Sequence, residues 1–196
     1  MSTGRRGLVG FLLLLAAAIT LSSIGPVERV LGASARVVYL HGAWVWSALI
    51  ALAAAAALGL FALILKDGRL HRWSTGWARS GTFFWLTSLL LSLWAMQTSW
   101  NGLFLDEPRW QLGVRFGVIA ILVQTAITLI RRPRLASALN VLFFAALGPA
   151  LLTTESVLHP SAPIAGSGLV RLFFTALLAA TSLAAWQLSA LLRPRW

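Results

Sequence analysis

The sequence contains no cysteine and few acidic residues. Its 196 residues include 5 Asp and Glu against 16 Lys and Arg, for a formal net charge of +11. Without thiols, the chain forms no disulfide, thiolate metal site or thiol redox centre, so any metal or cofactor must use nitrogen or oxygen ligands. Charged residues of both signs make up only 11% of the chain, which is too few for a soluble domain.

Long apolar stretches account for most of the sequence, and 59% of the residues are hydrophobic. A helix that rises about 1.5 Å per residue needs roughly 20 apolar residues to cross a hydrocarbon core about 30 Å thick. We therefore predict an all-α integral membrane protein, a bundle of six transmembrane helices that forms a single polytopic domain over residues 1–196. The predicted spans are 7–24, 42–65, 82–100, 112–130, 135–152 and 169–192.

The first apolar stretch follows Arg5 and Arg6, as the core of a cleavable signal follows its basic region. No clear small-residue cleavage site stands after Leu21, and five further stretches follow. We therefore expect a retained first helix.

The sequence lacks the residues that several functional classes need. No predicted span carries a charged residue near its middle, which argues against a pump or ion-coupled transporter with buried carboxylates. No phosphate-binding loop is present, so any ATPase must be a partner. The basic residues lie in short connections between apolar stretches and not on one soluble face, which argues against nucleic-acid binding.

The charge distribution predicts the orientation. Eleven of the 16 basic residues fall at the two ends and in alternate connections, where Asp67 is the one acid. Short loops obey the positive-inside bias, so both termini should be cytoplasmic in the cell membrane. The connections 25–41, 101–111 and 153–168 should then face outward.

Aromatic and polar side chains near the span ends have ordinary roles in a membrane protein. Aromatic residues near the span ends are expected to lie in belts at the membrane–water interface. On the outer side these are Tyr39, Trp44, Trp46, Trp100 and Trp110. On the inner side they are Trp73, Trp77 and Trp196. His71 lies in the basic connection and is expected to be a solvated surface residue.

Polar residues within the spans predict helix packing. Amide side chains are costly in lipid and should form interhelical hydrogen bonds. Gly113 and Gly117 form a small-xxx-small contact in the fourth span. The amides are Gln97, Gln124, Asn140 and Gln187.

Two histidines, His41 and His159, belong to the predicted outer side. Two neutral imidazoles brought together by helix packing can supply both axial positions of a haem iron. Taken alone, His41 could cap a helix and His159, before a proline, could fix a turn. The third outer loop adds the aromatic faces of Trp100, Phe104 and Trp110. Arginines at this side that could pair with haem propionates are Arg36, Arg109, Arg115 and Arg171.

The sequence resembles the haem-handling membrane proteins of cytochrome c maturation, the CcmC and CcsA group. Arg36-Val37-Val38-Tyr39-Leu40-His41 with Ala43-Trp44 is similar to the family's histidine-bearing helix start. Ser92-Leu93-Trp94, followed by Trp100 through Arg109, resembles the approach to its tryptophan-rich loop, with Glu107 and Arg109 in the acid and arginine positions. That loop is degenerate, because Leu103, Phe104 and Asp106 stand where tryptophans are usual. Ser156-Val157-Leu158-His159-Pro160 is a shortened version of the second histidine segment.

The resemblance implies a function without bond chemistry of its own, so an enzyme is not expected. His41 and His159 would be the axial ligands of a non-covalent b-type haem, lined by Trp100, Phe104, Arg109 and Trp110. The protein would hold haem at the outer membrane face for delivery in cytochrome c biogenesis. Its implied partners are membrane lipid, an ABC-type ATPase with its membrane subunits, and a membrane-anchored periplasmic haem chaperone or apocytochrome c.

Two alternatives remain open. A membrane-bound bis-histidine electron carrier of cytochrome b type would keep its haem through turnover, although such carriers usually place both ligands within helices. A non-haem scaffold or permease subunit of an ABC-type complex would use the same histidines and tryptophans only at the membrane interface.

Overall fold

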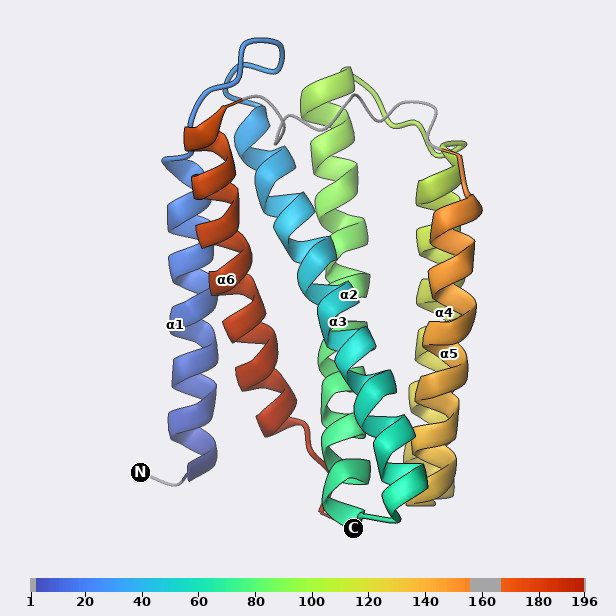
Figure 1. Ribbon diagram of the computed structural model, residues 1–196. Coiled ribbons are helices and arrows are strands. Elements are labelled where there is room, and N and C mark those ends of the chain that lie inside the picture. Colours follow the sequence, from blue (N-terminus) through green and yellow to red (C-terminus); the bar gives the residue numbers. More distant parts are fainter. Residues whose placement is uncertain (1–2, 156–166, 196) are drawn as a thin grey trace.

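The computed structural model describes residues 3–155 and 167–195, and this part of the chain folds into an up-and-down bundle of six α-helices (Figure 1). The predicted all-α fold class is confirmed. The helices are α1 (Thr3–Ser23), α2 (Ala35–Leu65), α3 (Gly68–Trp100), α4 (Pro108–Ile130), α5 (Pro133–Thr153) and α6 (Gly168–Leu191).

Five of these helices, all except α3, are long and apolar enough to cross a membrane, which shows a multi-pass membrane protein. Four helices begin at least four residues before their predicted spans. Helix α1 starts at Thr3 instead of residue 7, α2 at Ala35 instead of 42, α3 at Gly68 instead of 82, and α4 at Pro108 instead of 112. Apolarity alone underestimated these helices, because their first turns carry arginines and small polar residues that helices tolerate outside the hydrocarbon.

Short turns separate the paired helices. Lys66 ends α2 in the left-handed conformation, with φ of 56°, and Asp67 begins α3 by accepting a hydrogen bond from the Arg69 backbone N–H at 2.6 Å. Arg131 ends α4 in the same conformation, with φ of 53°, and Pro133 opens α5. A left-handed residue followed by an N-cap or proline stops one helix and starts the next, which makes these pairs antiparallel.

Helix α3 is more polar than its neighbours because it lies inside the bundle, packed against α2, α4, α5 and α6. Two of its buried hydroxyls and one indole bond to the backbones of neighbouring helices. Ser74 Oγ donates to Ala55 O at 2.8 Å, and Ser80 Oγ donates to Ala185 O at 2.7 Å. Trp85 Nε1 donates to Gly113 O at 2.9 Å. Burial within protein therefore explains its low hydropathy.

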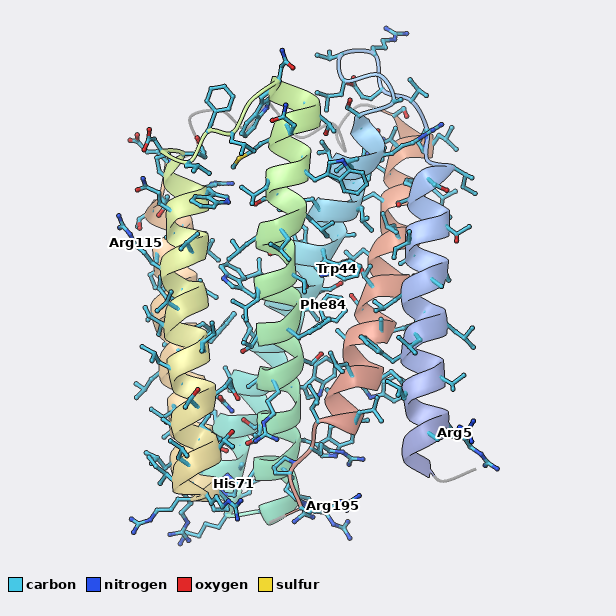
Figure 2. The ribbon with its side chains drawn as sticks, turned by 180° about the vertical axis from the view of Figure 1, so that it is seen from behind. Arg5, Trp44, His71, Phe84, Arg115 and Arg195 are labelled. Carbon is cyan, nitrogen blue, oxygen red and sulfur yellow. The ribbon has the colours of Figure 1, made fainter. Side chains whose placement is uncertain are left out.

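Figure 1 shows α1 beside α6 on one side, α4 beside α5 on the other, and α2 and α3 between them. The two chain ends lie together with the turns at 66–67 and 131–132, and we call this the basic end. The connections 24–34 and 101–107 lie at the opposite end, which we call the aromatic end. Arg5, His71 and Arg195 are at the basic end, and Arg115 is toward the aromatic end (Figure 2).

The glycine contact predicted for the fourth span is confirmed. A Cβ at Gly113 would lie 2.9 Å from Leu89 Cδ2, and one at Gly117 would lie 3.2 Å from Leu86 Cδ2. These glycines allow α4 to approach α3 closely.

The interhelical amide bonds are confirmed for two of the four residues. Asn140 Nδ2 donates to Ser74 Oγ at 3.0 Å, and Gln187 Nε2 donates to Gly7 O at 3.3 Å. The prediction is wrong for Gln97, whose side chain is exposed.

A close-packed region between α2, α3, α4 and α5 contains three polar side chains among apolar ones. Three of their oxygen atoms have no hydrogen-bond partner within the described ranges: Thr82 Oγ1, Gln124 Oε1 and Asn140 Oδ1. Asn140 is thus bonded through its amide nitrogen alone.

Candidate functional site at the aromatic end

His41 lies in the second turn of α2, inside the helix and not at its entrance. The expected position was wrong because the helix begins at Ala35, and Arg36 is accommodated in its first turn outside the apolar core. Arg36 Nε donates to Gly25 O at 3.0 Å, which ties the start of α2 to the end of the preceding connection. The His41 side chain is half-buried.

Two aromatic residues that flank His41 are core residues and not members of an interfacial belt. Tyr39 is 1% exposed, and its ring packs edge-on against Phe173 at 5.6 Å between centroids. Trp44 donates from Nε1 to Thr87 Oγ1 at 2.7 Å and lies against Phe84 at 4.9 Å, a pair visible in Figure 2. The belt expectation failed here because α2 faces α3 and α6 over this stretch. Helix packing therefore fixes the backbone that carries His41.

The connection between α3 and α4 presents aromatic rings at the same end of the bundle. Trp100 closes α3, and Asn101 turns the chain with φ of 55°. Phe104 then packs edge-on against Trp100 at 5.8 Å and remains 41% exposed. Two partly open rings in contact provide an apolar wall of the kind that a flat macrocycle requires.

Arg109 and Trp110 belong to the first turn of α4 and not to a loop, because Pro108 starts the helix early. The Arg109 side chain is exposed. The indole Nε1 of Trp110 is buried and has no hydrogen-bond partner among the described residues, and the same holds for Tyr39 Oη. A buried polar atom without a partner is a costly exception in proteins.

The predicted second ligand, His159, lies outside the described residues. Helix α5 ends at Thr153 and α6 begins at Gly168, and both helix ends are at the aromatic end (Figure 1). The remaining candidate arginines are both exposed, and Arg115 contacts Gln111 Oε1 at 3.4 Å. Across 3–155 and 167–195, no group of three or more His, Asp or Glu side chains is arranged around a metal position.

His71 was misplaced by the sequence analysis. It is 4% exposed, and its Nδ1 lies 2.7 Å from Ser137 Oγ of α5. Burial lowers the pKa of the imidazole, and the nearby Arg134 guanidinium lowers it further, while Asp67 opposes them. The missed signal is the cap at Asp67, which starts α3 early and turns this histidine toward α5.

Comparisons with known proteins give no match to a family model, to a curated protein or to a solved structure. The resemblance to cytochrome c maturation proteins thus depends on the residues quoted above.

Proposed function

We propose that this protein holds haem at the aromatic end of the bundle and passes it on during cytochrome c biogenesis. One observation carries the proposal: His41, the Trp100–Phe104 ring pair and the α4 turn with Arg109 and Trp110 all belong to the same end of the bundle. The connection that contains His159 starts and finishes at that end as well.

The residues present suit a non-covalent haem. Imidazole nitrogen is a standard iron ligand, and His41 sits on a helix fixed by packing on both sides. Trp110 Nε1 and Tyr39 Oη are buried polar atoms that can bond to a ligand, and the exposed Arg109 can pair with a propionate. In this proposal His41 and His159 are the axial ligands. A haem held there supplies reversible one-electron chemistry and an exposed edge for transfer.

The proposal includes six membrane spans with both termini in the cytoplasm. Helix α3 lies among helices that are long enough to span, so it crosses with them, and Ser74, Ser80 and Trp85 bond to neighbouring helices. The basic end carries Arg5 and Arg195, and the positive-inside bias assigns it to the cytoplasm. The aromatic end then faces outward, where an acceptor can reach the haem.

An optical titration tests the proposal. The full chain, purified in detergent, is titrated with haemin, and the reduced and oxidised spectra are recorded for the wild type, His41→Ala and His159→Ala. We expect a low-spin bis-histidine spectrum in the wild type and its loss in both variants. His71→Asn is the matched control, since it removes a histidine at the other end and should leave the spectrum unchanged.

Two outcomes would contradict the ligand assignment. An unchanged low-spin spectrum in His41→Ala or His159→Ala would show that the iron is bound elsewhere. A wild-type protein that binds no haem would favour the scaffold or permease subunit, in which the aromatic residues act only at the interface.

A second candidate function, electron transfer by a resident haem, gains support from the position of His41. Because His41 lies within α2 and not in a loop, it resembles the helix-borne ligands of b-type carriers. Transfer to an apo-acceptor separates the two functions. Release of haem to apocytochrome c or to a haem chaperone supports delivery, whereas a haem that stays bound through repeated reduction and oxidation supports an electron carrier.

A further inference from the structure

An open groove of about 770 Å³ lies at the basic end, between the turn that joins α2 to α3 and the turn that joins α4 to α5. Its rim carries three exposed cations, Lys66, Arg132 and Arg134. Its apolar wall includes Leu63 of α2 and Leu135 of α5, and His71 lies buried at its floor. The groove is therefore amphipathic, with a charged mouth and a hydrocarbon side.

In the part of the chain that the structure describes, the three cations of the rim outnumber the one acid near them, Asp67. Among the described residues, no ion pair or side-chain hydrogen bond engages Lys66, Arg132 or Arg134. Asp67 caps α3 by accepting the Arg69 backbone N–H at Oδ1 at 2.6 Å, and its single charge can offset only one of the three cations. Burial is the main cause of the lowered pKa of His71, and the Arg134 guanidinium at the rim adds to it. An anion is the complementary occupant.

The start of α5 adds to the positive charge of the rim. Helix α3 is capped by Asp67, and α6 by Ser167, which accepts from Val170 N–H at 3.2 Å. Helix α5 has Arg132 at its N-cap and no side-chain cap. Its first turn, which lines the groove, therefore presents the positive end of the helix dipole on the same side as the three cations.

The apolar wall identifies the kind of anion. It continues onto the outer faces of α2 and α5, where Ile64 is 64% exposed, Leu65 is 65% exposed and Leu142 is 64% exposed. In a multi-pass membrane protein such surfaces face acyl chains. A small soluble phosphate would engage the rim and leave the wall unused, whereas a phospholipid engages both.

We propose that this groove binds an anionic phospholipid. Its phosphate lies among Lys66, Arg132 and Arg134, and its acyl chains run along Leu63 and Leu135 onto the exposed face of α2. The site lies at the opposite end of the bundle from the haem proposal and does not depend on it. It differs from the general positive-inside bias because it requires these three cations and not the other basic residues of the same end.

Native mass spectrometry of the full chain in detergent tests the site. The probes are phosphatidylglycerol and phosphatidylcholine of identical acyl chains. We expect the wild type to retain phosphatidylglycerol in preference to phosphatidylcholine. A basic residue near an anionic headgroup contributes roughly fivefold in affinity, so Arg132→Gln with Arg134→Gln should weaken phosphatidylglycerol binding roughly thirtyfold, and Lys66→Gln alone roughly fivefold.

The matched control is Arg5→Gln with Arg6→Gln, which removes the same charge from exposed positions at the same end. It should change lipid affinity less than roughly threefold. All the substituted side chains are exposed, so thermal midpoints should agree among the variants.

Three results would overturn the proposal. Equal losses in the two double variants would show that the attraction comes from overall charge. Equal retention of both lipids would show that no anion is recognised. Displacement of phosphatidylglycerol by millimolar inorganic phosphate would show a site for soluble phosphate instead of lipid.

Discussion

The two ends of the bundle treat buried polar groups in opposite ways. Near the basic end, His71 Nδ1 lies 2.7 Å from Ser137 Oγ, and Asn140 Nδ2 lies 3.0 Å from Ser74 Oγ. At the aromatic end, Tyr39 Oη and Trp110 Nε1 are buried with no partner among the described residues. Unpaired groups also occur in the bundle interior, where Thr82 Oγ1, Gln124 Oε1 and Asn140 Oδ1 have no partner among the described residues.

This contrast separates polar groups that stabilise the fold from polar groups that the proposal assigns to a ligand. A buried polar group left unpaired costs roughly 1–3 kcal/mol. The bonds at the basic end tie α3 to α5 and stabilise the bundle. The unpaired groups at the aromatic end contribute no such bond, and the haem proposal assigns them to the ligand. Substitutions that remove a bonded group should therefore lower stability, and substitutions that remove an unpaired group should not.

The close approach of α3 to α6 in the basic half is the contact least tolerant of added atoms. A Cβ at Gly76 would lie 2.5 Å from Ser189 O, which is backbone and has little freedom to move. Gly76→Ala should therefore destabilise the protein by about 1–3 kcal/mol, measured as a lower thermal midpoint in detergent. Gly148→Ala is the control, because nothing lies within 4 Å of its added Cβ. Equal midpoints for the two variants would contradict the packing.

The bond between Asn140 and Ser74 should matter next. Asn140→Ala removes the 3.0 Å hydrogen bond between α5 and α3 and should cost about 0.6–1.7 kcal/mol, the range for bonds between helices in membranes. The control is Gln97→Ala, an exposed amide, which should stay within about 0.5 kcal/mol of the wild type. A larger loss of stability in Gln97→Ala than in Asn140→Ala would show that the bond between Asn140 and Ser74 does not stabilise the bundle.

His71 makes the basic end sensitive to acid. Burial and Arg134 lower its pKa below the ordinary 6.5, so between the two values the unfolded chain binds a proton that the folded chain does not. Stability is therefore highest above pH 6.5 and falls as the pH drops below it, by at most about 1.4 kcal/mol per pH unit for one group. The other charged groups near His71 are Asp67, which opposes the shift, and Lys66 and Arg132 around the groove.

The measurement compares thermal midpoints of the wild type and His71→Asn from pH 7.5 to pH 5.5, taken as about one unit on either side of the ordinary value. The variant lacks the titrating group, so the difference between the two proteins should shift in its favour at low pH. A difference that does not change with pH would show that the His71 pKa is not lowered.

The sequence was sufficient for the bundle because apolar stretches of membrane length have few other solutions. It did not predict where the helices start. Arg36, Arg69 and Arg109 are typical of loops, but they lie in the first turns of α2, α3 and α4. The misplacement of His71 has the same origin. Its neighbours in sequence are basic and polar, whereas its neighbours in space belong to α5, and only the fold reveals that contact.

The sequence predicted which residues of the candidate site share one end of the bundle, but not how their side chains pack. Alternation of the spans was enough to group His41 with Trp100, Phe104 and Trp110. The burial of Tyr39 and Trp44 could not be predicted, because an aromatic residue near a span end is ordinarily interfacial. Which face of α2 meets α3 and α6 is a property of packing, and the near-uniform apolarity of this helix hides it.

The smallest expected effect belongs to the aromatic end. Tyr39→Phe removes the unpaired hydroxyl and retains the ring contact with Phe173 at 5.6 Å, so no stabilising bond is lost and the thermal midpoint should not fall. Trp44→Phe, which breaks the 2.7 Å bond to Thr87 Oγ1, is the comparison and should be clearly destabilising. If the hydroxyl serves a ligand, haemin affinity should fall in Tyr39→Phe while stability is retained. A marked loss of stability in Tyr39→Phe would show instead that the hydroxyl supports the fold, and the distinction between the two ends would fail.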